Sequence, residues 1–216
     1  MEKQKRLSHI VLIIYYGFTL CAAIYALRQG AELYTILLAA AAFLLPIVPF
    51  LVYRVLHLRR VPLLEIVLNL FVLSAVPFAS LFGGYELIPP WDKILHFLSG
   101  FLFATLGMII YFYKKPGRRL DPADAFNASA FSWMFAVWTA AIWEFWEYFV
   151  SFSGADPQQV AATGVGDTMQ DMIVCALGGL ITAVSCFKYV RGKKEGRGLM
   201  MHLFDSFYKE NIERKE

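Results

Sequence analysis

The sequence predicts an all-α, polytopic membrane protein: a bundle of six transmembrane helices with both termini in the cytoplasm and an amphipathic helix at the C-terminus. Composition is the first reason, because 58% of the 216 residues are hydrophobic and 17% are charged, whereas soluble domains hold about 45–50% apolar and about 25% charged residues. The second reason is that the apolar residues form six segments, each near the roughly 20 residues that cross a bilayer. The third is a one-sided distribution of Lys and Arg.

The first predicted span covers residues 10–27 and follows Lys3, Lys5 and Arg6. A secretory signal peptide begins in a similar way. This apolar run is longer, at roughly 18 residues, and no small-residue cleavage site precedes Arg28. We therefore expect the segment to be retained as a span.

The other five predicted spans cover residues 33–55, 62–82, 91–113, 127–152 and 167–190. Pro46 and Pro49 should kink the second span, because proline removes a helical hydrogen bond. Segment 153–166 is polar and contains no Lys or Arg. Residues 1–190 are thus predicted to form one membrane domain, and residues 191–216 a basic cytoplasmic tail.

Basic residues determine the predicted orientation. With the N-terminus inside, the inner segments hold 18 of the 20 Lys and Arg residues, and the outer loops hold Arg28 and Lys93. Because basic loops remain in the cytoplasm, both termini are predicted to be cytoplasmic. The tail places Leu199, Leu203 and Phe207 at helical spacing, which predicts an amphipathic helix on the membrane surface. A helix packed against a partner protein is the alternative.

The remaining composition narrows the classes of function. Cys21, Cys175 and Cys186 all lie in apolar spans, which argues against a disulfide framework. The sequence has no Gly-rich phosphate loop and no nucleic-acid-binding motif. The expected partners are therefore membrane lipids, and no nucleic acid is predicted.

Ionisable side chains converge at the predicted outer ends of the last three spans. They come in pairs at helical spacing: Asp92 and His96, Glu144 and Glu147, and Asp167 and Asp171. At a rise of 1.5 Å per residue, all six lie roughly within 12 Å of the outer helix ends. Ionisable residues inside a span are costly and usually functional. The sequence therefore predicts an outward-facing acidic pocket with one histidine, in a functional unit of about residues 85–182.

Five carboxylates cannot all stay ionised in one pocket without compensation. Two unit charges about 4 Å apart repel by about 4 kcal/mol at an effective dielectric constant of 20. Either some carboxylates are protonated or a cation lies among them. Lys93 is the nearby basic residue, unless its side chain extends toward the lipid headgroups instead.

Carboxylates combined with an imidazole are suitable ligands for Mg²⁺, Mn²⁺, Ca²⁺ or Zn²⁺. We predict a divalent metal ion as the cofactor, held by Asp92, His96, Glu144 and Asp171, with Glu147 and Asp167 as further or alternate ligands. Glu144 and His96 are the predicted catalytic groups.

Simpler roles compete with this interpretation. Asp167 and Gln170 have the spacing of a capping box, and Asp92 after Pro-Pro-Trp also suits a helix cap. Glu147 is compatible with an exposed position at the membrane interface, and His96 with a structural role. Tryptophans of the fifth span are expected to act as interface anchors and packing residues.

Two further features concern helix packing rather than chemistry. Glu65 and Asn69, near the inner end of the third span, predict an interhelical hydrogen bond away from the cluster. Gly178 and Gly179 predict a close contact between helices.

The cluster carries a resemblance to the YjdF-like family of bacterial inner-membrane proteins. That family has a His-containing helix, an E-x-x-E helix and a G-D-x-x-x-D-M segment, matched here by His96, residues 144–147 and residues 166–172. The resemblance implies a multi-pass protein of the bacterial inner membrane. It implies no particular reaction.

VanZ-like proteins, associated with resistance to teicoplanin, resemble the chain more distantly. Their D-K-x-x-H helix is matched by residues 92–96. They tend to have Gln and Asn where Glu147 and Cys175 stand here. Both resemblances cover about residues 85–182.

Three functions are compatible with the sequence. The first is a metal-dependent hydrolase acting on a lipid or lipid-linked cell-envelope substrate, with water activated by Glu144. The outer face has little Arg or Lys to bind a phosphate, which argues against it. The second is a cation- or proton-coupled transporter, although Glu65 is the one obvious acid toward the inner face. The third is a non-catalytic binder of an envelope lipid or partner.

Overall fold

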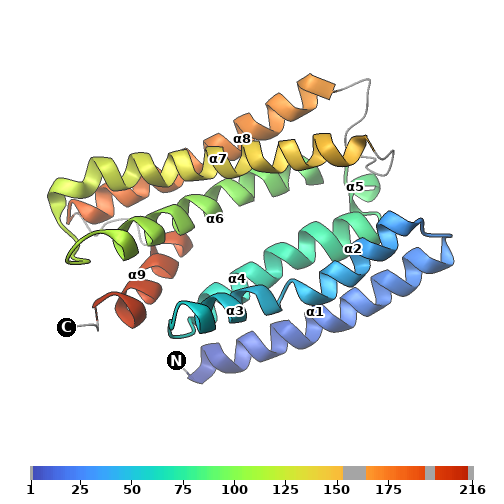
Figure 1. Cartoon of the computed structure of the whole chain (residues 1–216), viewed down its shortest axis with the longest axis horizontal. Helices are drawn as coiled ribbons and strands as arrows, with labels where there is room; N and C mark the ends of the chain where they lie inside the picture. Colours follow the sequence, from blue (N-terminus) through green and yellow to red (C-terminus); the bar gives the residue numbers. More distant parts are fainter. Residues whose placement is uncertain (1, 153–163, 193–197, 214–216) are drawn as a thin grey trace. The chain divides into compact units, whose positions relative to one another are not determined.

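The computed structural model describes residues 2–152, 164–192 and 198–213, and every regular element in these ranges is helical (Figure 1). Five helical segments among the described residues are long and apolar enough to cross a membrane, and the bent pair Leu33–Leu44 and Ile47–Val55 adds a sixth if it forms one span. This confirms the predicted all-α membrane architecture. The chain divides into two compact units, residues 1–91 and 92–216.

The first unit contains α1 (Glu2–Arg28), α2 (Leu33–Leu44), α3 (Ile47–Val55), α4 (Pro62–Leu73), the π-helix η1 (Ser74–Leu81) and the short α5 (Gly84–Leu87). Pro46 lies between α2 and α3, whose axes are bent by 48°. The missing N–H of proline explains the break, so the predicted kink is confirmed. Pro49 lies in the first turn of α3, where proline is tolerated.

Polar side chains link the helices of this unit inside an apolar core. Ser8 of α1 donates a hydrogen bond to Glu65 of α4 at 2.9 Å, and the Tyr15 hydroxyl donates to the Ala42 carbonyl at 2.7 Å. Arg60 also pairs with Glu65 at 2.7 Å. The predicted interhelical hydrogen bond of Glu65 is therefore confirmed.

The second unit contains most of α6 (Trp91–Lys114), the 3-10 turn η2 (Pro122–Asp124), α7 (Ala125–Ser151), α8 (Gly164–Val190) and α9 (Leu199–Asn211). Helices α6, α7 and α8 run alongside one another (Figure 1). Ser132 of α7 donates to the Ala104 carbonyl of α6 at 2.5 Å, and Trp133 donates to the Ala176 carbonyl of α8 at 2.9 Å. Part of segment 153–166, which we expected to be a polar outer loop, lies outside the described residues.

Glycines allow α6 and α8 to pack backbone to backbone. A Cβ atom added at Gly100 would lie 2.1 Å from the Cys175 carbonyl oxygen, and one at Gly178 would lie 2.2 Å from the Phe97 carbonyl oxygen. Any larger residue would push these helices apart, because both neighbours are main-chain atoms. The close contact predicted at Gly178 and Gly179 is confirmed, with Gly100 as its counterpart on α6.

Helix α9 packs its apolar face on the ends of α6 and α8. The Phe204 ring lies 5.6 Å from Phe112 and 5.7 Å from Tyr189, and its side chain is fully buried. The Tyr189 hydroxyl donates to Asp205 at 2.8 Å. We expected this face to contact the membrane surface from a separate tail. It is instead covered by the second unit itself.

Candidate functional site

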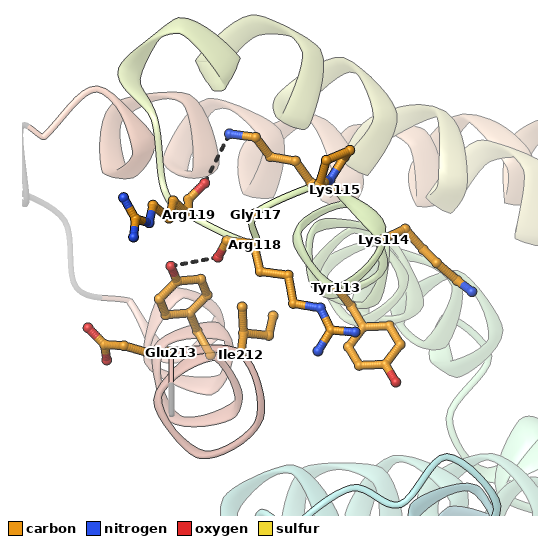
Figure 2. Close-up of a pocket in the computed structure, with 10 residues that line it drawn as sticks. Tyr113, Lys114, Lys115, Gly117, Arg118, Arg119, Ile212 and Glu213 are labelled. Atoms are coloured by element: carbon orange, nitrogen blue, oxygen red, sulfur yellow. Dashed lines mark hydrogen bonds between the residues drawn. The ribbon is translucent and has the colours of Figure 1, made fainter. Parts of the chain in front are cut away.

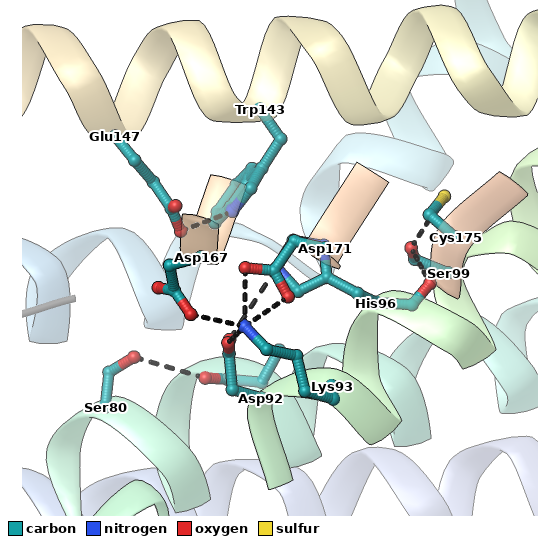
Figure 3. Close-up of polar contacts among 11 residues, drawn as sticks. Ser80, Asp92, Lys93, His96, Ser99, Trp143, Glu147, Asp167, Asp171 and Cys175 are labelled. Carbon is teal, nitrogen blue, oxygen red and sulfur yellow. Dashed lines mark hydrogen bonds and ion pairs between the residues drawn. The ribbon is translucent and has the colours of Figure 1, made fainter. Parts of the chain in front are cut away.

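The candidate site lies on the first turns of α6 and α8. Helix α6 begins at Trp91, which places Asp92 and Lys93 in its first turn and His96 one turn further. Helix α8 begins at Gly164, which places Asp167 in its first turn and Asp171 in its second. The glycine contact between the two helices, one turn beyond these residues, brings the side chains of both helices together (Figure 3).

Lys93 lies at the centre of the cluster. Its Nζ atom is 3.0 Å from Asp92 Oδ2, 2.6 Å from Asp167 Oδ1 and 2.8 Å from Asp171 Oδ2. Asp171 Oδ1 is also 2.8 Å from Nζ, although outside hydrogen-bonding geometry. The lysine does not extend away toward the headgroups. It supplies the cation that the predicted carboxylate repulsion requires.

The charges of this cluster are balanced only in part. Three ionised aspartates around one ammonium leave a formal charge of −2. The Asp171 side chain is 3% exposed, whereas those of Asp92 and Asp167 are 25% and 31% exposed. Solvent therefore screens two of the carboxylates, while Asp171 depends on its partners inside the protein.

His96 completes the cluster without replacing Lys93. Its Nε2 atom lies 3.6 Å from Asp92 Oδ1 and 3.8 Å from Asp171 Oδ1, beyond hydrogen-bonding distance. One ligand atom each from Asp92, His96 and Asp171 lies within 4.8 Å of the other two. Two carboxylates and one imidazole in this arrangement are a donor set that suits a divalent cation.

Glu144 of α7 is a buried acid of the site whose carboxylate makes few hydrogen bonds. The residue is 3% exposed, and neither of its carboxylate oxygens meets hydrogen-bonding geometry with any donor in the described part of the chain, although Thr168 of α8 is a polar neighbour. It lies close enough to Asp92, Lys93 and Asp167 to interact with their charges. A buried carboxylate without hydrogen bonds is costly, so Glu144 is suited to take up a proton or a cation.

Glu147 is buried, which is compatible with the predicted pocket and rules out the exposed interface position that was the alternative. It is 5% exposed rather than accessible at the interface, and it accepts a hydrogen bond of 2.6 Å from Trp143 Nε1 on the same helix. Sequence reasoning assigned Trp143 to anchoring and packing and missed this bond. The four-residue spacing of Trp143 and Glu147 was the available signal, since it places both on one helix face.

The alternative roles of Asp92 and Asp167 as helix caps do not fit the structure. Helix α8 begins three residues before Asp167, so this carboxylate lies inside the helix and binds Lys93. Asp92 likewise lies within α6 and binds Lys93. Sequence reasoning missed how central Lys93 is, although its three-residue spacing from His96 placed both side chains on one face of the helix.

One turn further along α6, the polar contacts continue toward α8. Ser99 Oγ donates to the His96 carbonyl at 2.7 Å and lies 3.5 Å from Cys175 Sγ. Ser99 and Cys175 are both buried. The contact with Cys175 joins this turn of α6 to α8, next to His96.

Comparison with known proteins gives a family but no activity. No curated protein and no solved structure matches the chain. The VanZ-like resemblance has no support beyond the residues that suggested it, whereas the YjdF-like one is consistent with the family found. The model of a family described as "Predicted membrane protein (DUF2238)" matches residues 8–192, all six predicted spans included, so the chain belongs to this family of membrane proteins.

Proposed function

We propose that this multi-pass protein is a metal-dependent hydrolase of the bacterial inner membrane, acting at the outer face on a lipid or lipid-linked cell-envelope substrate. The observation that carries the proposal is the approach of ligand atoms from Asp92, His96 and Asp171 to within 4.8 Å of one another. A divalent ion would draw them closer, to about 2.0–2.2 Å from a zinc ion, for example. Glu144, and then Asp167 and Glu147, are the further acids available to the ion.

The residues divide the chemistry between them. A bound cation supplies the charge that makes a water molecule acidic at neutral pH. Glu144 would accept the proton from that water, because its carboxylate is buried and has the Thr168 hydroxyl as a neighbour, but makes no hydrogen bond of good geometry in the described part of the chain. His96 would hold the ion through its neutral imidazole.

The depth of the cluster supports a substrate that arrives from the bilayer. Asp171 is the eighth residue of α8, and Glu144 lies seven residues before the end of α7. At 1.5 Å per residue both are about 10 Å from the helix ends. With the helix ends at the outer surface of the bilayer, this depth would lie near the boundary between headgroups and acyl chains.

Metal content and thermal stability test the proposal directly. We expect purified protein to contain a divalent ion, and its melting temperature to fall with chelator and recover with the added ion. A hundredfold excess of ion over its dissociation constant corresponds to about 2.7 kcal/mol of stabilisation. The increment should shrink as pH falls, because protons compete for the ligands.

Variants separate a specific site from general ion binding. Glu144→Gln and His96→Ala should abolish the metal-dependent increment. Glu65→Gln is the matched control: it removes a buried, paired carboxylate of the first unit and should lower the basal melting temperature while leaving the increment intact. The proposal would be overturned if the purified protein contained no metal and its melting temperature changed with neither added cations nor chelator.

One observation favours a second candidate, a non-catalytic binder of an envelope lipid or partner. Lys93 already contacts all three aspartates, so an ion-pair network without metal could serve as a purely structural element. In that case purified protein holds no metal and Glu144→Gln leaves its binding of envelope lipids unchanged.

A further inference from the structure

A hollow of about 900 Å³ lies at the end of α6 opposite the acidic cluster. It is formed by the last turn of α6, the loop that follows and the end of α9 (Figure 2). Its lining residues include two tyrosines and four basic residues: Tyr113, Tyr208, Lys114, Lys115, Arg118 and Arg119. The hollow is thus basic, in contrast to the acidic cluster at the other end of α6, where Lys93 is surrounded by three aspartates.

The loop is held in a defined shape. Gly117 and Arg118 both adopt positive φ values, 71° and 50°, which turn the chain back on itself. Lys115 binds Asp124 and donates to the Arg119 carbonyl at 3.0 Å. The Tyr208 hydroxyl donates to the Arg118 carbonyl at 2.9 Å and fixes α9 against the loop. Both sides of the hollow are therefore connected by hydrogen bonds (Figure 2).

Two of the basic groups remain available for a ligand. The Arg118 guanidinium lies 4.5 Å from the centre of the Tyr113 ring, which positions it without neutralising it. Within residues 2–152, 164–192 and 198–213, no carboxylate forms an ion pair with Arg118 or Lys114. Glu213 also lines the hollow, but it lies on the far side from Lys114 and the Arg118 guanidinium (Figure 2).

The position of this hollow relative to the bilayer indicates which class of ligand it can bind. Lys114 is the last residue of a membrane-spanning helix, so its ammonium lies at headgroup level. Under the predicted orientation this is the cytoplasmic leaflet, whose anionic lipids attract basic juxtamembrane groups. Guanidinium and ammonium groups are both good phosphate ligands.

We propose that the hollow between the end of α6 and α9 binds the phosphate headgroup of an anionic phospholipid through Lys114 and Arg118. The site is separate from the acidic cluster and does not depend on the proposed hydrolase activity. A bound headgroup would contact both the α6–α7 loop and α9, and so would fasten α9 to the membrane domain.

Titration of the detergent-purified full chain with short-chain phosphatidylglycerol tests the proposal, with phosphatidylcholine as the uncharged comparison and thermal stability as the readout. We expect phosphatidylglycerol to bind more tightly than phosphatidylcholine. Lys114→Gln and Arg118→Gln should each weaken that binding about fivefold, as expected for the loss of one charge near a membrane surface. Added salt should weaken the wild-type binding.

Arg191→Gln is the matched control, because Arg191 follows the end of α8, lies over the Phe187 ring at 5.5 Å and does not line the hollow. It should bind phosphatidylglycerol like the wild type. Equal loss in all three variants, or equal affinity for both lipids, would overturn the proposal. Displacement of the lipid by millimolar inorganic phosphate would overturn the lipid as ligand and leave a site for soluble phosphate. Lys114 is exposed, so its variant tests the site even where Arg118→Gln fails to fold.

Discussion

The ammonium of Lys93 contacts carboxylates from two helices, and this arrangement determines what the cluster can bind. A divalent ion at Asp92, His96 and Asp171 would need the space and the carboxylates that Lys93 now occupies. Lysine and metal are therefore competing cations for one site. The flexible four-carbon stem of lysine allows it to withdraw when a stronger cation arrives.

This competition predicts the behaviour of Lys93→Gln. Without added metal, the variant should be less stable by about 1–3 kcal/mol, less than the loss of a fully buried partner because 28% of the Lys93 side chain is exposed. Added divalent cation should restore more stability to the variant than to the wild type, and should bind it more tightly. Thermal unfolding with and without cation measures both effects.

Lys209→Gln provides the contrast, since Lys209 is 61% exposed and pairs with Asp205 on the surface of α9. Its loss should cost less than about 1 kcal/mol and should not change the response to cations. A Lys93→Gln protein with wild-type stability and no response to cations would mean that the aspartates are neutral without any cation.

At the level of helices, the contact between α6 and α8 sets the geometry of the cluster. Gly100 and Gly178 each meet a carbonyl oxygen of the opposite helix. Gly100 lies one turn after His96 on α6 and meets Cys175, one turn after Asp171 on α8, so any displacement there is transmitted to the ligand atoms. Small residues at such a contact are the means by which transmembrane helices approach closely.

Gly100→Ala should therefore destabilise the protein by about 2–3 kcal/mol and weaken cation binding, because its Cβ would overlap main-chain atoms of α8. Gly17→Ala is the matched control. Gly17 lies mid-helix in α1, and a Cβ there meets nothing within 4 Å, so the change should be neutral or stabilising by up to about 1 kcal/mol. Denaturant unfolding and cation titration of both variants measure the difference. Equal stability of the two variants would show that the helices are not packed this closely.

For the whole molecule, the sequence predicted the spans well because apolar length is a direct consequence of bilayer thickness. Pro46 marked the break between α2 and α3, and the acid and histidine spacing marked the residues of the cluster. The hydrogen-bond and ion-pair partners of these residues were harder to predict, because they depend on which side chains meet between helices. Helical spacing places Lys93 beside His96 and Glu147 beside Trp143, but it does not show whether these side chains are buried against a neighbouring helix or exposed.

Helix α9 is a second case in which the sequence pattern did not identify the contacting surface. Its apolar spacing indicated that one face is covered, but the same pattern suits a lipid surface, a partner protein or the rest of the chain. Only the contacts of Phe204 with Phe112 and Tyr189 identify what covers it. The tail beyond residue 190 is thus joined to the second unit, whereas sequence reasoning separated it.

Orientation is the prediction that concerns the whole chain, because it decides whether the acidic cluster faces outward. It follows from the uneven distribution of Lys and Arg among the loops, 18 of 20 on one side. A cysteine introduced at Phe152, the exposed residue after α7, should react with a membrane-impermeant maleimide added to intact cells. A cysteine introduced at Pro116, in the loop after α6, should react only once the membrane is opened. Lys114, Lys115, Arg118 and Arg119 remain in both variants, so the charges that determine the orientation are unchanged. The opposite labelling pattern would place the aspartates and Lys93 on the cytoplasmic side, and a substrate from the cell envelope could then no longer reach them.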